Sequence, residues 1–332
     1  MIESVRFKNF KALRDTTLPL GRFTLIVGPN GSGKSTALQA LGAVARPDRL
    51  AFLNIASVGA MGNPEMCVEV DVRWSGETRT LFELRWNRNG AWVGGDRATS
   101  RPVEPASVVE RLQRIRIFEL NAQAIAAPVP LNPSMELAQN GGQLAGVLDR
   151  LRDNDPDRLD ALNEELARWL PEFDRVLFDT PDSGIRALKL RTQDEHHAIP
   201  ASELSQGTLL SLAMLTLAYL PDPPLVVCLE EPDRGIHPRL LRQVQDALYR
   251  LSYPEEHGET REPTQVVATT HSPVMLDLYR ERPEEIVIAN KIGQDVRFQR
   301  LIDQPNIEEI LGDAHLGEIW YSGILGGVPL ES

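Results

Sequence analysis

The sequence predicts an α/β fold built around a buried parallel β-sheet. Three apolar runs carry this prediction: FTLIV at 23–27, PLVVCL at 224–229 and TQVVATT at 264–270. Strands that are apolar on both faces belong at the centre of a sheet that helices cover on both sides. A helical pattern follows the first run, and another, LLRQVQDALYRL at 240–251, lies between the other two. Such alternation of strand and helix is typical of parallel sheets.

The length and composition fit a folded protein with a substantial core. The chain has 332 residues, of which 42% are hydrophobic, enough for one large domain or two ordinary ones. Its formal net charge is −12. Because a DNA duplex repels an acidic surface, the composition excludes a protein that coats nucleic acid by bulk electrostatics, and any DNA contact must be local.

The sequence shows neither an export signal nor a membrane span. The opening MIESVRFKNF alternates charged with apolar residues, unlike a signal peptide. The longest apolar run, at 209–220, stops at Pro221, well short of the roughly 20 residues that a transmembrane helix needs. Cys67 and Cys228 lie in apolar, strand-like runs, which favours buried thiols over disulfides. We therefore expect a cytoplasmic protein without membrane contact.

Residues 1–127 form the first predicted lobe. It opens with the β-rich pattern IESVRFKNF and, after the glycine-rich loop, has a helix at 36–44. Residues 66–92 alternate apolar with polar side chains, with breaks at Ser75-Gly76 and Asn89-Gly90, and an Asn-Gly pair indicates a hairpin. We therefore expect an antiparallel β extension, then a helix in SVVERLQR and a strand in RIRIFEL.

A helical insert at 128–175 and a second lobe at 176–332 complete the predicted organisation. Pro128 and Pro133 bound a linker, and Asp155-Pro156 is a good helix start. One face of that helix is apolar and should pack into a core. The residues on this face are Leu159, Leu162, Leu166 and Leu170.

The glycine-rich loop has the pattern of a phosphate-binding loop. GPNGSGKS, at 28–35, fits G-x-x-x-x-G-K-[ST] and stands between a buried strand and a helix, the context that the mechanism requires. Backbone N–H groups and the helix N-terminus hold phosphate, Lys34 reaches the β- and γ-oxygens, and Ser35 offers its hydroxyl to Mg²⁺. The loop thus predicts a nucleoside triphosphate with magnesium. The expected contacts are Asn30, Gly31, Ser32, Gly33, Lys34, Ser35 and Thr36.

Acidic residues and a histidine follow the other two buried strands. Glu230 and Glu231 end PLVVCLEE, and adjacent acids at a strand end are costly unless they are used. We expect Glu230 near the metal and Glu231 polarising the attacking water. His271, in TTHSP, ends the next strand, so it should lie at the same sheet edge and contact the γ-phosphate. A solvated strand end and a structural histidine are the alternatives.

The motif LSQGT, at 204–208, precedes the longest apolar helix. A helix N-terminus with Ser205 and Gly207 can hold a phosphate, although the chain already has one such helix after its P-loop. A second phosphate-binding terminus favours a nucleotide that is shared between two protomers.

These motifs, in this order, resemble those of the ABC-ATPase superfamily. GPNGSGKS, LSQGT, VVCLEEPDRGIHP and TTHSP are similar to the motifs of RecF/SMC-like AAA-type ATPases, which include OLD-family nuclease heads and anti-phage ATPases. The resemblance implies one ABC-ATPase head domain that binds and hydrolyses ATP with Mg²⁺. It implies Walker A at Gly28 to Thr36, Walker B at Glu230 and Glu231, a switch His271, and Ser205 and Gly207 as signature contacts made in trans, so that an ATP-sandwich homodimer forms.

Two positions differ from the pattern of related proteins, and the pattern does not define a third one clearly. Glu230 stands where most relatives have an aspartate on the metal's water shell, and the extra methylene alters the reach to Mg²⁺. His237 occupies the D-loop position where transporter subunits have an aspartate. Gln123, just after RIRIFEL, is the candidate Q-loop residue and metal contact.

Several biological settings are compatible with this head. We favour a conformational switch in DNA repair or anti-phage defence that acts with a separate nuclease or other effector. The span between Lys34 and Ser205 has no sustained heptads, and the stretch after His271 is too short for a nuclease domain of roughly 100 residues. The alternatives are a transporter-like nucleotide-binding subunit, which EEP and LSQGT disfavour, and a nucleotide-sensing module with vestigial hydrolysis.

Two surfaces are candidates for contact with partners. The apolar tail LGEIWYSGILGGVPL, from 316, could dock the effector because aromatic residues anchor interfaces, while packing back on the second lobe is the stronger alternative. Local basic faces could contact DNA, although solvated helix charge is the ordinary interpretation. The arginines of these faces are Arg111, Arg114 and Arg116, and separately Arg239, Arg242 and Arg250.

Overall fold

The computed structural model describes residues 1–47, 51–63, 65–75, 80–95, 110–132, 134–305, 307, 312, 315–323 and 325. The chain forms two compact units, each of which is discontinuous in sequence. The first unit consists of Met1–Ile117, Pro224–Glu231 and Pro263–Ser332, and the second of Phe118–Pro223 and Pro232–Glu262. The sequence-based boundaries at 127 and 175 stay a prediction.

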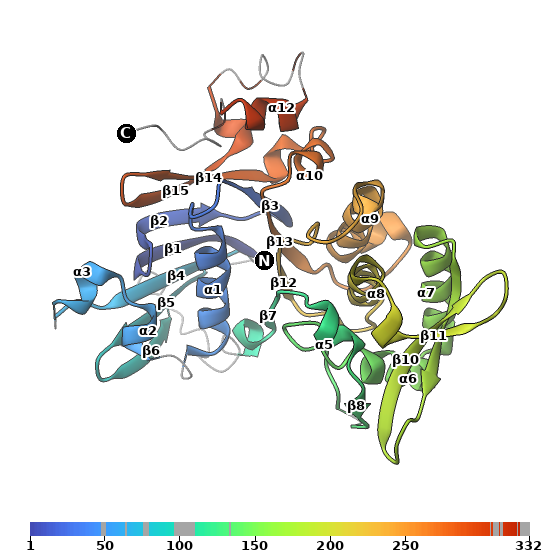
Figure 1. The fold of residues 1–332 in the computed structure, drawn as a ribbon. Helices are drawn as coiled ribbons and strands as arrows, with labels where there is room; N and C mark the ends of the chain where they lie inside the picture. The colour runs from blue at the N-terminus through green and yellow to red at the C-terminus, as the bar shows by residue number, and fades with distance from the viewer. Residues whose placement is uncertain are drawn as a thin grey trace. The chain divides into compact units, whose positions relative to one another are not determined.

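A mixed sheet of six strands forms the centre of the first unit (Figure 1). The strand β3 pairs in parallel with β13 on one side and with β14 on the other, and β13 pairs in parallel with β12. All residues of β3 and β13 are buried, as their apolar sequences predict. The strand order is β15 (Asp295–Arg300), β14 (Ile286–Ile292), β3 (Phe23–Val27), β13 (Gln265–Thr270), β12 (Val226–Glu230) and β7 (Ile115–Phe118).

A second, antiparallel sheet of five strands confirms the predicted β extension. Its hairpin turns at Arg88-Asn89, with Asn87 opposite Gly90, so the predicted Asn-Gly break marks the turn one residue late. Gly90 has a φ of 142°, which only glycine adopts readily. The strands, in order, are β2 (Leu13–Pro19), β1 (Ile2–Phe10), β4 (Val68–Trp74), β5 (Thr80–Asn87) and β6 (Gly90–Gly95).

The helix α1 (Lys34–Ala45) joins the two sheets of this unit in one hydrophobic core. Leu38 and Leu41 of α1 are fully buried, in the same cluster as Phe7 of the antiparallel sheet and Cys228 of the mixed sheet. The helix begins directly after the P-loop, so the core anchors the loop at its helical end. Two short helices, α2 (Phe52–Ile55) and α3 (Val58–Met61), follow.

The C-terminal tail packs back on the first unit. The helix α12 (Leu316–Tyr321) contacts α10 (Pro273–Asp277), and a Cβ on Gly317 would come within 2.7 Å of the Pro273 carbonyl oxygen. Ile319, Trp320 and Leu325 are buried, so they do not form the exposed docking surface, whereas Tyr321 is 82% exposed. Ile324 of the proposed surface lies outside the described residues.

The second unit combines helices with a small antiparallel sheet. The predicted helix start is confirmed, since the Asp155 carboxylate caps α7 by accepting from the Arg158 N–H at 3.2 Å. The sheet and its hairpin between β9 and β10 have no counterpart in the sequence predictions. The helices are α5 (Ala122–Ala126), α6 (Leu144–Asn154), α7 (Pro156–Trp169), α8 (Gln206–Ala218) and α9 (Leu241–Ser252); the strands are β8 (Val129–Pro130), β9 (Phe173–Asp179), β10 (Ile185–Thr192) and β11 (Ala198–Pro200).

The cysteines and apolar helices match the expectations only in part. Both cysteines are free thiols, and Cys228 is fully buried, which raises its pKa to about 12. Cys67 is only half-buried and directly precedes β4 instead of lying within it. Within the residues that the structure describes, no helix has the length and apolar character to cross a membrane.

Candidate functional site

The P-loop residues lie where β3 ends and α1 begins, as the sequence predicts. Lys34 is the first residue of α1 and is only 6% exposed. Its ammonium donates to the carbonyl oxygens of Gly28 at 2.6 Å and Pro29 at 3.0 Å, across the inside of the loop. Ser35 and Thr36 follow in the first helical turn, while Asn30 and Gly31 are exposed at the tip of the loop. The loop therefore has one buried cation and free helix N–H groups, the features that bind phosphate.

Two glycines of this loop are required by its geometry. A Cβ on Gly28 would lie 2.5 Å from both the Ala289 carbonyl oxygen and the Ser32 hydroxyl, so no other residue fits without displacing the neighbouring strand β14. Gly33 has a φ of 94°, in the left-handed region that side chains disfavour. Glycine at these two positions lets the loop backbone lie close to β14 and turn its N–H groups toward the phosphate site.

Electrostatics at Lys34 favour an incoming anion. Burial lowers the pKa of Lys34, while the negative charges of Glu231 and Glu230 oppose that shift. Among the described residues, the hydrogen-bond partners of this desolvated ammonium are two loop carbonyls. Phosphate oxygens stabilise it more strongly, because hydrogen bonds between two charged groups are stronger than those to a neutral carbonyl.

Glu230 and Ser35 form the candidate magnesium site. Glu230 is the last residue of β12, and the Ser35 hydroxyl donates to its Oε1. Among the described residues, no group of three or more His, Cys, Asp or Glu residues could hold a metal ion. Mg²⁺ in nucleotide sites uses one or two protein oxygens, waters and the phosphates themselves, so a hydroxyl beside a carboxylate fits this ion.

Glu231 is held by the neighbouring strand in an unusual backbone conformation. Its φ is 46°, and its N–H donates to the Thr269 carbonyl oxygen at 3.1 Å and to the Thr269 hydroxyl at 3.3 Å. The Glu231 carboxylate contacts His271 Nδ1 at 2.7 Å. The structure therefore brings the predicted base and the predicted switch histidine into direct contact. A non-glycine residue in this region is strained, and such strain is common at functional sites.

Thr269 is the residue of this cluster that sequence reasoning missed. It is 1% exposed, and its hydroxyl and carbonyl both accept from Glu231. The signal was available in TTHSP, because two threonines before the histidine place a hydroxyl at the strand end. The strand β13, which carries Thr269, lies between β3 and β12, so the P-loop, the acidic pair and His271 all follow adjacent parallel strands.

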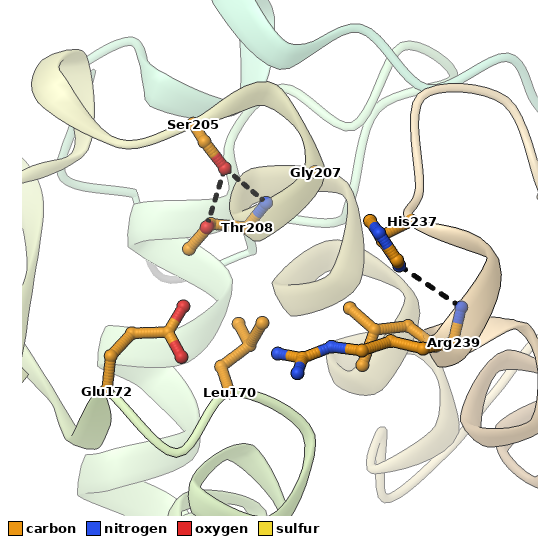
Figure 2. Close-up of a pocket in the computed structure, with 8 residues that line it drawn as sticks. Leu170, Glu172, Ser205, Gly207, Thr208, His237 and Arg239 are labelled. Carbon is orange, nitrogen blue, oxygen red and sulfur yellow. Dashed lines mark hydrogen bonds between the residues drawn. The ribbon is translucent and has the colours of Figure 1, made fainter.

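The signature residues belong to the second unit. Ser205 caps α8: its hydroxyl accepts from the Thr208 N–H at 3.1 Å and lies 2.8 Å from the Thr208 hydroxyl. A Cβ on Gly207 would lie 3.1 Å from the Gly235 carbonyl oxygen, so a small residue is favoured there. A pocket of about 280 Å³ opens beside this helix start (Figure 2). Its lining comprises Leu170, Glu172, Ser205, Gly207, Thr208, His237, Arg239 and Leu240.

Gln123 is exposed on the short helix α5 of the second unit. The candidate metal residues Ser35 and Glu230 belong to the first unit, and Gln123 belongs to the second. The assignment of Gln123 as the Q-loop residue and metal contact therefore stays a prediction.

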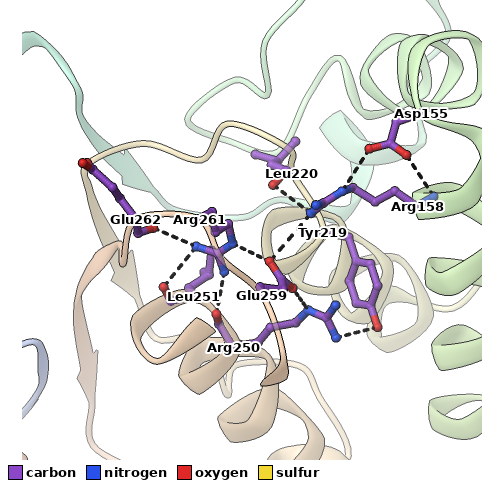
Figure 3. A network of polar contacts seen from close by, with 9 residues as sticks. All are labelled: Asp155, Arg158, Tyr219, Leu220, Arg250, Leu251, Glu259, Arg261 and Glu262. Atoms are coloured by element: carbon purple, nitrogen blue, oxygen red, sulfur yellow. Dashed lines mark hydrogen bonds and ion pairs between the residues drawn. The ribbon is translucent and has the colours of Figure 1, made fainter. Parts of the chain in front are cut away.

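One arginine of the predicted basic faces belongs to an internal network instead (Figure 3). Arg250 contacts the Glu259 carboxylate at 2.6 Å, donates to the Tyr219 hydroxyl at 3.0 Å and lies over the Tyr219 ring. Arg261 and Arg158 contact the same carboxylate, at 2.6 and 3.9 Å. Arg250 is therefore committed to stabilising the second unit.

Comparisons with known proteins identify the family of the chain. A family model described as "AAA domain, putative AbiEii toxin, Type IV TA system" matches residues 94–277, more than half of the chain. The chain is a member of this AAA family. A second model, described as "AAA ATPase domain", matches residues 1–76, which include the P-loop.

Relatives of this AAA family member include a nuclease and chromosome-maintenance proteins. It is 23% identical to the OLD nuclease of Thermus scotoductus over 96% of this chain and 68% of that protein. It is 28% identical to the structural maintenance of chromosomes protein 1B of Homo sapiens, over 44% of this chain and 13% of that protein. The chain thus spans about two thirds of the first relative and a small part of the second.

Solved structures confirm the predicted fold. An SMC head bound to the C-winged helix domain of ScpA matches with a TM-score of 0.62 at 17% identity, over 90% of this chain and 96% of that chain. The SMC head domain from Thermotoga maritima matches with a TM-score of 0.50 at 16% identity, over 90% and 98%. The AAA family member therefore has the ABC-ATPase head fold of the RecF, SMC and OLD type.

Proposed function

We propose that this protein hydrolyses ATP with Mg²⁺ and works as a nucleotide-dependent dimer switch. The observation that supports this most is the meeting of four predicted residues of the first unit: Ser35 contacts Glu230, and Glu231 contacts His271, where β3, β13 and β12 end beside the buried Lys34. A merely structural strand end does not need a buried cation, two carboxylates and a histidine together.

Each side chain of this cluster has a distinct task in the proposal. Lys34 exchanges its loop carbonyls for the β- and γ-phosphate oxygens, and Ser35 with Glu230 holds the metal. Mg²⁺, when bound, neutralises charge on the phosphates. Glu231 orients the attacking water and accepts its proton. His271 holds the Glu231 carboxylate through Nδ1 and offers its other ring nitrogen to the γ-phosphate.

The dimer part of the proposal rests on the second phosphate-binding terminus. The start of α8, with Ser205 and Gly207, has the character of the signature motif, and the P-loop already supplies the primary phosphate site. We infer that α8 of one copy closes over the nucleotide on the P-loop of another. Energy from ATP is then expressed as a change in dimer geometry.

The dimer is tested by light scattering with and without ATP. Glu231→Gln should slow hydrolysis and shift the protein toward dimer in ATP, while the further change Ser205→Arg should abolish that shift because it places bulk and charge against the opposing phosphate. A dimer that is indifferent to ATP and to Ser205 would contradict the sandwich. Measured wild-type turnover separates an active ATPase from a sensing module with vestigial hydrolysis.

We propose DNA repair or anti-phage defence as the setting, with a separate nuclease or other effector. The similarity to an OLD nuclease over 96% of the chain supports the setting. The test is co-expression with the product of the neighbouring gene, followed by co-purification and an assay of DNA cleavage. If the protein remains alone and cleaves DNA by itself in an ATP-dependent reaction, the separate effector is wrong and the nuclease activity lies in this chain.

A further inference from the structure

We infer that Arg239 is a phosphate-contacting residue that acts in trans, on the ATP held by the P-loop of the partner copy. This inference rests on the proposed sandwich dimer. In that dimer the signature motif at the start of α8 offers hydroxyl and backbone N–H groups to the nucleotide, and Arg239 would add a cation to the same face. The supporting observations are the pocket beside α8, the position of Arg239 in it and the state of its guanidinium.

Arg239 lines the same pocket as the signature residues. The pocket is formed within the second unit, with Ser205, Gly207 and Thr208 on one side and His237 and Arg239 on another. Figure 2 shows the Arg239 side chain extended toward Leu170, below the start of α8. A ligand group that fits this space therefore meets hydroxyls and a guanidinium together.

The Arg239 guanidinium is free to bind a ligand. Its backbone N–H donates to His237 Nδ1 at 3.2 Å, which fixes the start of the segment. Among the residues that the structure describes, none makes a hydrogen bond or an ion pair with the guanidinium itself. Arg250, farther along the same segment, is by contrast bound to Glu259 and Tyr219. A planar fork of donors suits phosphate oxygens.

The charges of the pocket predict the direction in which each substitution changes ATP-dependent dimerisation. The lining residues include one arginine and one carboxylate, Glu172. A triphosphate should gain from Arg239 and be repelled by Glu172. Two substitutions that each remove one charge from the same pocket should therefore change ATP-dependent dimerisation in opposite directions.

The expected size of the effect on dimerisation follows from the symmetry of the proposed dimer. One charge-assisted bond to phosphate corresponds to roughly a 10-fold change in affinity. A two-fold symmetric dimer contains two such sites, so Arg239→Gln should weaken ATP-dependent dimerisation by about 100-fold. Glu172→Gln should strengthen it. Arg242→Gln is the matched control, because it removes the same charge a few residues away, outside the pocket lining.

The first experiment measures dimerisation by sedimentation with ATP, in the Glu231→Gln background. ATP affinity at low protein concentration should be unchanged by Arg239→Gln, since the P-loop of each copy is intact. Equal losses in Arg239→Gln and Arg242→Gln would show a general charge effect and overturn the inference. A loss in Glu172→Gln as large as that in Arg239→Gln would overturn it too, because the pocket's shape and not its cation would then matter.

The second experiment separates action in trans from action within one copy. When Lys34→Ala and Arg239→Gln proteins are mixed, one composite site has an intact P-loop facing an intact Arg239, so ATPase activity should partly return. Mixing Ser205→Arg with Arg239→Gln leaves no intact site, and activity should stay low. A third mixture, of Lys34→Ala with Ser205→Arg, is the control for the sandwich. If this mixture recovers ATPase activity and the first mixture does not, the inference about Arg239 is wrong while the sandwich dimer is supported. No recovery in any mixture would contradict the sandwich itself.

Discussion

Two glutamates of this protein sit in opposite electrostatic surroundings. Glu259, in the second unit, is 11% exposed and its carboxylate contacts Arg250, Arg261 and, at longer range, Arg158. Glu231, in the first unit, is 23% exposed, and its carboxylate contacts His271 from a left-handed backbone. One carboxylate is surrounded by guanidinium groups, while the other contacts an imidazole ring.

The difference teaches which charge supports the fold and which is available for chemistry. A buried carboxylate that is matched by fixed arginines is locked in place, and removing it leaves uncompensated cations. The Glu231 carboxylate, which contacts an imidazole instead of a cluster of arginines, keeps lone pairs for water, at the cost of backbone strain. Stability should therefore depend on Glu259, and turnover on Glu231.

The largest expected effect is on the stability of the second unit. Glu259→Gln should cost about 3 kcal/mol of unfolding free energy, because three arginines lose their shared carboxylate and Arg261 is largely buried. Hydrogen exchange resolved by segment can measure this, and the loss should concentrate in α9 and the segment after it. If the P-loop unit loses as much protection as α9, Glu259 is not a local stabiliser and the comparison fails.

The next effect is on catalysis. Glu231→Gln should lower kcat roughly 100-fold while ATP binding is retained, because the amide cannot accept the proton of the attacking water. The measurement pairs phosphate release with an ATP titration and a thermal unfolding curve. Near-normal turnover would place the base elsewhere, and a fall in stability as large as that of Glu259→Gln would make Glu231 a structural residue.

Binding of nucleotide provides the third test. Lys34→Ala should weaken ATP binding by roughly 10-fold or more, since a charge-assisted contact with phosphate is lost. Folding should be little affected, because the ammonium's hydrogen-bond partners within the described part of the chain are two loop carbonyls. Isothermal titration on the variant and the wild type decides this. If the variant binds ATP with unchanged affinity, the assignment of this loop as the phosphate-binding loop is wrong.

The smallest effect is expected at an exposed ion pair on the antiparallel sheet. Arg6 and Asp15 make two bonds, at 2.9 and 3.0 Å, with both side chains about half exposed. Asp15→Asn should cost less than about 1 kcal/mol. The Arg6 guanidinium lowers the pKa of Asp15, so the pair stabilises the fold above the unfolded pKa of roughly 3.9 and loses that contribution as pH falls through the lower folded value. Urea unfolding at neutral pH and at about pH 3 tests this; a cost near that of Glu259→Gln would contradict it.

Much of the first unit could be predicted because its signals are contiguous. The P-loop, the buried strands at β3, β12 and β13, and the helix α1 each depend on a short run of sequence. Parallel strands also end at one sheet edge, so the order of motifs predicted that His271 lies at the same edge as Glu231, although not their direct contact. By contrast, β14 and β15 and the hairpin of β9 and β10 were missed, since their strands carry no motif.

The sequence by itself determined the family and the fold class, and it predicted the residues of the candidate site, because local patterns of glycine, charge and apolar spacing encode them. Only the tertiary structure decided that Thr269 holds Glu231, that Arg250 belongs to Glu259 while Arg239 is free, and that Trp320 is buried. Each of these depends on residues far apart in sequence that compete for the same partners. Which contact forms is settled by packing and desolvation over the whole unit, and no short run of sequence contains that information.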